Sequence, residues 1–174
     1  MIPPVILPFF GSLYLLPFML TAHRRPVCLS MFSTDLPVGS VVETAATIYQ
    51  KDHERFHLLL SEPSILEQQS QEAPTANSSR LLWLEISPYR VIMTMQANGQ
   101  VSYRHFWEQG VYGTSRYCLQ SKSLQGSHQI RLRNFTRCLS LVGRTMPEHL
   151  RLEYELWSEK VQLGQHILNL EIHS

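Results

Sequence analysis

The stretch VIMTMQANGQVSYRHF, residues 91–106, decides the fold class of this chain. Apolar and polar side chains alternate in its two arms, Val91–Met95 and Val101–Phe106, with the period of a strand that buries one face. Between the arms lie Asn98 and Gly99, the pair most typical of a tight hairpin turn because both residues tolerate positive φ. The stretch therefore predicts an antiparallel hairpin.

The same alternation continues on both sides of this hairpin. Leu81–Ile86 is expected to form a strand before it, and turn residues separate further strands over 114–120, 129–141, 150–156 and 161–172 after it. Six or seven antiparallel strands after residue 80 predict a mainly β domain. An antiparallel meander of this kind forms a small barrel or a strongly bent sheet, because an open flat sheet would leave two unpaired edges.

Two structures fit residues 41–60. Ser40 and Glu43 match a capping box, so Val41–Leu60 could form one N-terminal helix. The β-branched residues between 41 and 48, followed by a turn at 51–53, favour a strand pair instead. Residues 61–79 are rich in Gln, Ser, Pro and Ala and predict a long exposed loop inside the same domain.

Length and composition predict a single globular domain. The chain has 174 residues, of which 44% are hydrophobic and 17% charged, which is enough apolar material for a core. Fifteen Lys and Arg against fourteen Asp and Glu give a net charge of +1, so no nucleic-acid partner is expected. The three cysteines, Cys28, Cys118 and Cys138, form no close pair, which predicts reduced thiols in a cytoplasmic protein.

The first thirty residues have a different character. Residues 2–22 carry no charge, and His23, Arg24 and Arg25 follow directly. A membrane anchor is one interpretation, which would place the domain on the cytoplasmic face of a membrane, although four prolines weaken it. A misassigned start, with translation beginning at Met19 or Met31, is the other. We therefore divide the chain into an apolar segment, 1–31, and one β-rich domain, 32–174.

An aromatic cluster is the candidate ligand-binding site. If strand alternation holds, Tyr103, His105 and Trp107 share one face, and Tyr112 and Arg116 follow after a glycine turn. Large flat side chains with polar ends suit a pocket that buries an apolar ligand and orients it with few polar contacts. The alternative is that these residues are ordinary barrel core and rim.

A row of arginines, Arg131, Arg133 and Arg137, precedes Glu153 and Glu155 on the next expected strand. Arginines of this kind can bind a carboxylate-bearing ligand or an acidic partner surface. Cross-strand ion pairs on the solvent face are the favoured interpretation.

The segment HERFH, residues 53–57, matches the metal-binding pattern H-E-x-x-H, in which His53 and His57 would bind zinc and Glu54 would act as general base. The pattern requires a buried helix, whereas the residues before His53 are polar, so a solvated turn is the other interpretation. The chain has no nucleophile motif or Gly-rich phosphate loop, and we predict no catalytic residue.

The leading hypothesis is a β-barrel module that binds a small, partly apolar ligand, such as a pigment or lipid, without a catalytic signature. In outline the expected architecture resembles the lipocalin-type barrels, which include bilin-handling lyases, and this likeness rests on the strand pattern alone. The second hypothesis is a protein-interaction or assembly factor, either free or tethered to a membrane through residues 2–22. A zinc hydrolase acting through the HERFH segment is the third. The sequence identifies no cofactor.

Overall fold

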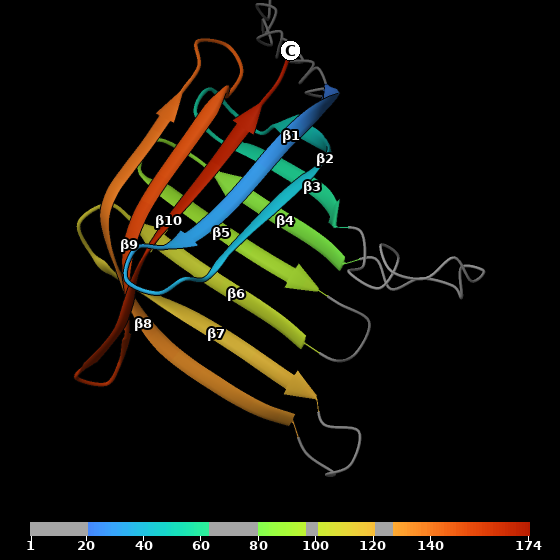
Figure 1. The fold of residues 1–174 in the computed structure, drawn as a ribbon. Helices are drawn as coiled ribbons and strands as arrows, with labels where there is room; N and C mark the ends of the chain where they lie inside the picture. Colours follow the sequence, from blue (N-terminus) through green and yellow to red (C-terminus); the bar gives the residue numbers. More distant parts are fainter. Residues whose placement is uncertain (1–20, 63–79, 97–100, 121–126) are drawn as a thin grey trace, which may run out of the picture.

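The protein is a closed antiparallel β-barrel of ten strands (Figure 1). A computed structural model describes residues 21–62, 80–96, 101–120 and 127–174. The strands, in chain order, are β1 (Ala22–Ser33), β2 (Gly39–Gln50), β3 (Phe56–Glu62), β4 (Arg80–Ile86), β5 (Arg90–Gln96), β6 (Val101–Glu108), β7 (Tyr112–Gln120), β8 (Ser127–Val142), β9 (His149–Ser158) and β10 (Val161–Ile172).

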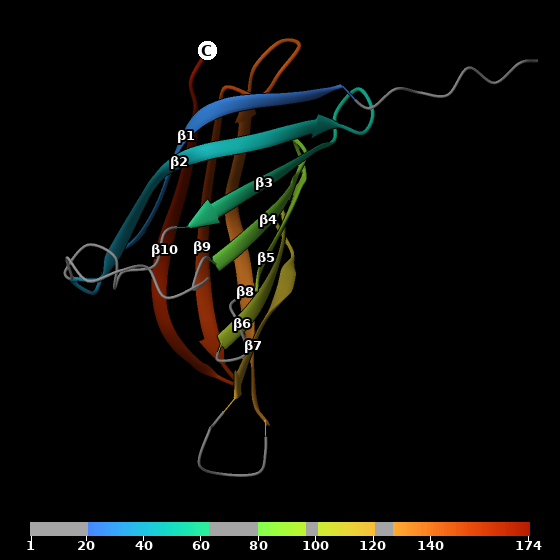
Figure 2. The same ribbon diagram turned by 90° about the vertical axis from the view of Figure 1, so that its right-hand side faces the viewer.

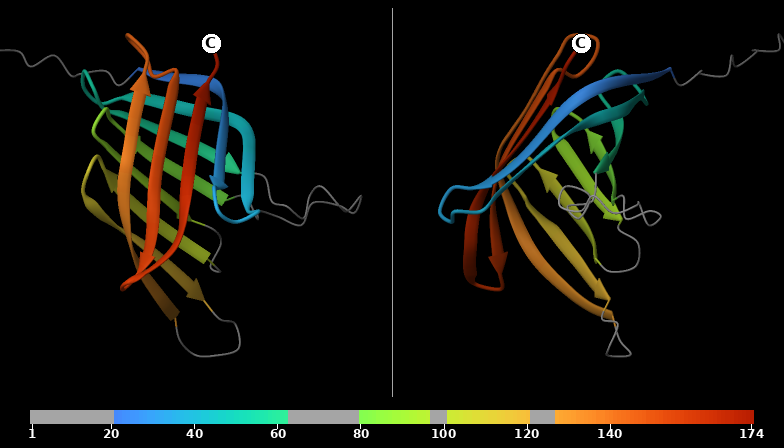
Figure 3. Two further views of the ribbon diagram at one scale, coloured as in Figure 1. Left: turned by 60° about the vertical axis from the view of Figure 1, so that its left-hand side comes forward. Right: turned by 45° about the vertical axis from the view of Figure 1, so that its right-hand side comes forward.

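Each strand pairs with its neighbours in the sequence, and β1 closes the ring by pairing with both β2 and β10. The barrel is flattened, so that β8–β10 form one wall and β3–β7 form a facing wall whose strands run at a steep angle to the first (Figure 3). Strands β1 and β2 lie across one side between these walls (Figure 2). This closure leaves no unpaired edge, which confirms the prediction of a small antiparallel barrel.

The described residues contain no helix. Residues 41–60 form parts of β2 and β3, so the strand-pair interpretation is confirmed and the N-terminal helix is wrong. The barrel has more strands than the lipocalin-type barrels that it was expected to resemble. The Asn98-Gly99 turn and most of the 61–79 loop lie outside the described residues, and β3 continues through Glu62 into the expected loop.

Strand β1 corrects the predicted boundary after residue 31. Ala22–Ser33 is a barrel strand, with Leu29 opposite Val42 of β2 and Leu170 of β10. The domain therefore includes residues 22–31. Residues 1–20, on which most of the proposed anchor falls, lie outside the described part of the chain. Within that part, no helix has the length and apolar character needed to cross a membrane.

Alternating side chains from all ten strands point into the barrel. On one side of the interior these side chains are almost all apolar and fully buried, and they form a continuous core. The buried core comprises Val27, Leu29, Ala46, Ile48, Phe56, Leu58, Leu60, Leu82, Leu84, Ile86, Val91, Met93, Met95, Leu150, Leu152, Leu168 and Leu170, together with Trp107 and Tyr154.

A β-bulge bends β8 at the point where it passes from one wall to the other (Figure 1). The register with β9 shifts between Thr136 and Cys138, so the inward positions change from Asn134 and Thr136 to Leu139 and Leu141. The bulge thus separates the inward polar pair Asn134 and Thr136 from the inward apolar pair Leu139 and Leu141.

Candidate ligand-binding site

Polar and aromatic side chains gather inside the barrel on the inner faces of the consecutive strands β6–β10. Strand alternation turns Tyr103, His105 and Trp107 of β6 inward, as the sequence predicted, and Trp107 is 0% exposed. Across the β6–β7 register His105 faces Ser115, which is also buried. On the next strand, the inward residues Asn134 and Thr136 are both buried. The other members of this group are Tyr117, Tyr154 and His166. We call these nine inward side chains the polar pocket, a name that refers to the side chains themselves.

A hydrogen-bond network connects three strands of the polar pocket. The Asn134 side-chain amide donates to Ser115 Oγ at 2.8 Å, and Ser115 Oγ lies 2.8 Å from His105 Nδ1. The tautomer of the neutral imidazole decides whether Ser115 Oγ or His105 Nδ1 donates in this second bond. The network fixes the side chains of His105 and Asn134 in place.

Burial keeps His105 uncharged. It lowers the pKa of His105 from 6.5 to about 4, and the nearby His166 contributes in the same direction. The pKa of His166 is itself lowered by burial, against the opposing effect of the Asp35 carboxylate. The polar pocket therefore presents neutral donors and acceptors at physiological pH.

This burial predicts a specific pH dependence of stability. Below pH 6.5 the unfolded chain protonates His105 while the folded chain does not, so stability falls as the pH drops from 6.5 toward 4. The total loss from this residue is about 3 kcal/mol. We expect chemical denaturation between pH 7.5 and 4.5 to show this slope, and we expect His105→Gln to flatten it. An identical slope in the variant would contradict the assignment.

Stacked rings line the polar pocket. The His105 and Trp107 rings are parallel within 3° with centroids 4.8 Å apart. Trp107 in turn contacts Tyr154 at 5.1 Å, and Tyr154 stacks on His166 at 5.2 Å. Tyr103 and Tyr117 meet His105 edge-on. Such surfaces suit a flat, partly apolar group.

Three buried polar atoms of the polar pocket have no hydrogen-bond partner among the residues that the structure describes. They are Trp107 Nε1, Asn134 Oδ1 and Thr136 Oγ1, and all three residues are 0% exposed. Leaving a buried donor or acceptor unpaired costs about 1–3 kcal/mol, so native proteins pair nearly all of them. The inner faces of β6 and β8 therefore carry one donor, one acceptor and one hydroxyl that polar groups of a ligand, or buried water, would satisfy.

Gly113 gives Asn134 its position. A Cβ atom built on Gly113 would lie 2.6 Å from Asn134 Oδ1 and 1.9 Å from the carbonyl oxygen of Phe106. Only a residue without a side chain lets β6 and β7 come this close while the Asn134 amide lies over β7.

The structure separates the five residues that the sequence grouped together. Tyr103, His105 and Trp107 are inside, whereas Tyr112 and Arg116 point outward, and Tyr112 is 55% exposed. One pocket cannot contain all five. Five further interior residues were not predicted from the sequence: Ser115, Asn134, Thr136, Tyr154 and His166. Strand alternation places Ser115 and Asn134 on inward positions, so these two could have been found.

The HERFH segment does not form a helix. His53 lies in the turn between β2 and β3, and His57 is on β3, where its Nε2 lies 3.8 Å from Glu85 Oε2. The one-turn helical spacing that the zinc pattern requires is therefore absent here. In the described ranges, no group of three or more His, Cys, Asp or Glu side chains is placed to hold a metal. The metal site stays a prediction.

The arginine row is only partly paired. Arg137, at the bulge, binds Glu155 with Nε 2.5 Å from Oε1, which confirms the cross-strand ion-pair prediction for these two residues. Glu153 pairs instead with Arg151, and Arg133 stacks over the Tyr112 ring at 4.2 Å.

The free thiols Cys28, Cys118 and Cys138 are half-buried.

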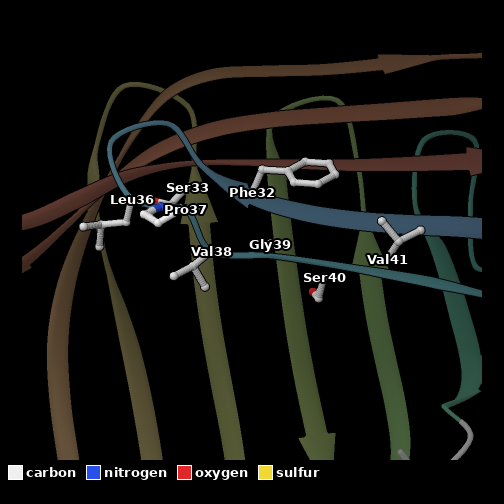
Figure 4. A pocket seen from close by; sticks show the side chains of 8 residues that line it. All are labelled: Phe32, Ser33, Leu36, Pro37, Val38, Gly39, Ser40 and Val41. Carbon is white, nitrogen blue, oxygen red and sulfur yellow. The ribbon is translucent and has the colours of Figure 1, made fainter. Parts of the chain in front are cut away.

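An open hollow lies at the β1–β2 turn, outside the barrel (Figure 4). This open pocket of about 340 Å³ is lined by exposed apolar side chains, among them Phe32, Leu36, Val38 and Val41. It shares no residue with the polar pocket.

Together these features define a ten-stranded antiparallel β-barrel protein with a polar and aromatic inner wall. Its fold is similar to that of the ywiB protein from Bacillus subtilis, whose crystal structure matches with a TM-score of 0.54 and 15% sequence identity over 87% of this chain and 94% of that chain. At this identity the likeness shows the fold alone. No protein-family model matches the chain, and the comparison with curated proteins found no match.

Proposed function

We propose that the protein binds a small, partly apolar ligand inside the barrel at the polar pocket. The single observation that carries this proposal is the set of three fully buried polar atoms without partners, on Trp107, Asn134 and Thr136. The stacked rings of His105 and Trp107 would hold a flat apolar portion of the ligand. A small pigment-like or lipid-like molecule with one carbonyl or hydroxyl group fits this description.

The polar atoms define which ligand groups fit. Trp107 Nε1 can only donate, so it would bind a carbonyl or ether oxygen. Asn134 Oδ1 can only accept and would bind a hydroxyl or amide hydrogen, while the Thr136 hydroxyl can do either. Because His105 is neutral and no charged side chain belongs to the polar pocket, the buried end of the ligand would be uncharged.

Thr136→Val tests this proposal because it separates binding from folding. Valine fills the same volume without the unpaired hydroxyl, so the variant should unfold at the same temperature or higher. Loss of a ligand hydrogen bond should weaken ligand retention about tenfold, measured as ligand occupancy by native mass spectrometry of protein produced in its own cells.

Tyr112→Ala is the matched control, because Tyr112 lies on the outer face and should leave occupancy unchanged. A Thr136→Val variant that is destabilised and keeps its ligand would instead show that the hydroxyl serves the fold.

A protein-interaction role is the second candidate. The exposed apolar side chains around the β1–β2 turn favour it, because a concentration of Phe32, Leu36, Val38 and Val41 on one surface is typical of contact sites (Figure 4).

A further inference from the structure

Three arginines lie directly opposite one another on the outside of the barrel. Arg104 of β6 pairs in register with Arg116 of β7, and Arg116 pairs with Arg131 of β8. All three are exposed, and the strands that carry them lie side by side (Figures 1 and 3). We call this row the arginine ladder.

The arginine ladder opposes folding rather than supporting it. Like charges directly across a sheet repel each other, whereas opposite charges at such positions stabilise. Among the described residues no Asp or Glu pairs with Arg104, Arg116 or Arg131, although Arg137 and Arg151 on the same sheet do have such partners. The missing negative charge would have to come from another molecule.

We propose that the arginine ladder docks an acidic helix of a partner protein. The interval between the arginines favours a helix over other acidic partners. Neighbouring strands are about 4.8 Å apart, so the backbone positions of the three arginines repeat at about that interval across the sheet. Carboxylates at positions i and i+3 or i+4 of a helix are about 5–6 Å apart, which is the nearest match. Same-face side chains of an extended strand repeat at about 6.6 Å, which is a poorer match.

The surroundings of the ladder favour a protein partner. The chain has a net charge of +1, so its surface as a whole does not attract nucleic acid. Beside the ladder, Arg133 stacks on the exposed ring of Tyr112 at 4.2 Å, and Arg and Tyr are the residues enriched in protein interfaces. The outer surface here is a sheet face rather than the polar pocket, so the inference does not depend on the proposed ligand.

The test uses a defined probe, an alanine-based helical peptide with Glu at positions i, i+4, i+7 and i+11 on one face. The full-length protein should bind this peptide at low salt, and Arg104→Gln/Arg116→Gln/Arg131→Gln should weaken binding about tenfold. A peptide of the same composition with its Glu residues scattered around the helix should bind about tenfold more weakly than the probe.

The matched control removes the same charge elsewhere. Arg24→Gln/Lys51→Gln/Arg144→Gln alters three exposed residues outside the ladder and should leave peptide binding unchanged. The ladder variant should also unfold at the same or a higher temperature and keep its interior ligand. Absence of peptide binding, equal binding of the scattered peptide, or tighter ladder-dependent binding of a single-stranded oligonucleotide would overturn the proposal.

Discussion

Removing residues 1–30 is expected to abolish the native barrel. The shortened chain would lack Ala22–Ser30, nearly all of β1, and with it the buried side chains of Val27 and Leu29. Burial of two such side chains contributes about 3–6 kcal/mol, which is a large share of the 5–15 kcal/mol that stabilises a typical domain. Strands β2 and β10 would also become unpaired edges, which favour aggregation.

Circular dichroism during thermal unfolding measures this effect. A chain without residues 1–30 should show no cooperative transition, whereas a chain without residues 1–20 keeps every residue of β1 and should unfold cooperatively. Of the two internal start sites, only Met19 would therefore yield the complete barrel. Cooperative unfolding of both shortened chains at one temperature would contradict the role of β1.

Gly113→Ala is expected to be the most damaging single substitution in the polar pocket. The new methyl group would lie 1.9 Å from the backbone oxygen of Phe106, so β6 and β7 would have to move apart. This displacement would also push the Asn134 amide away from Ser115. We expect the free energy of unfolding to fall by about 2–4 kcal/mol in urea titrations, and the proposed ligand binding to be lost with it.

Gly110→Ala, in the same β6–β7 turn, is the control. Gly110 has a φ of +74° and nothing within 4 Å of its Cβ position, so alanine there meets only the left-handed backbone strain of about 1 kcal/mol. Equal losses at the two glycines would show that backbone conformation, rather than contact between β6, β7 and Asn134, explains the effect.

Local patterns in the sequence were sufficient to predict the strands after residue 80. Alternation around the 91–106 hairpin placed Tyr103, His105 and Trp107 on one face, and all three point into the barrel. Alternation reports which side chains share a face, and burial of the apolar set decides which face turns inward.

The first strand was missed for a physical reason. Ala22–Ser33 begins with charged residues and contains Pro26, so it resembles the end of an apolar segment more than a barrel strand. Val27, Leu29 and Met31 occupy alternate positions, as in a strand with one buried face. Three apolar residues are too few to predict a strand unless its partner strands are known. Those partners, β2 and β10, are neighbours of β1 in space, and β10 is more than one hundred residues away in the sequence.

The polar pocket could be predicted only in part. The inward positions of Ser115 and Asn134 follow from simple alternation in 114–120 and 129–141, but polar residues at such positions do not reveal which strands face each other. The bulge after Thr136 shifts the alternation of β8, and no residue type marks its place. Closure of the barrel then brings Tyr154 against Trp107, and His166 against Tyr154.

The most direct test of the ligand-binding proposal is a comparison of the native and denatured masses of the protein purified from its own cells. If a ligand occupies the polar pocket, the native mass will exceed the denatured mass by one small molecule, and Thr136→Val will reduce that species while Tyr112→Ala will not. Equal native and denatured masses would contradict the proposal and assign the unpaired atoms of Trp107, Asn134 and Thr136 to buried water.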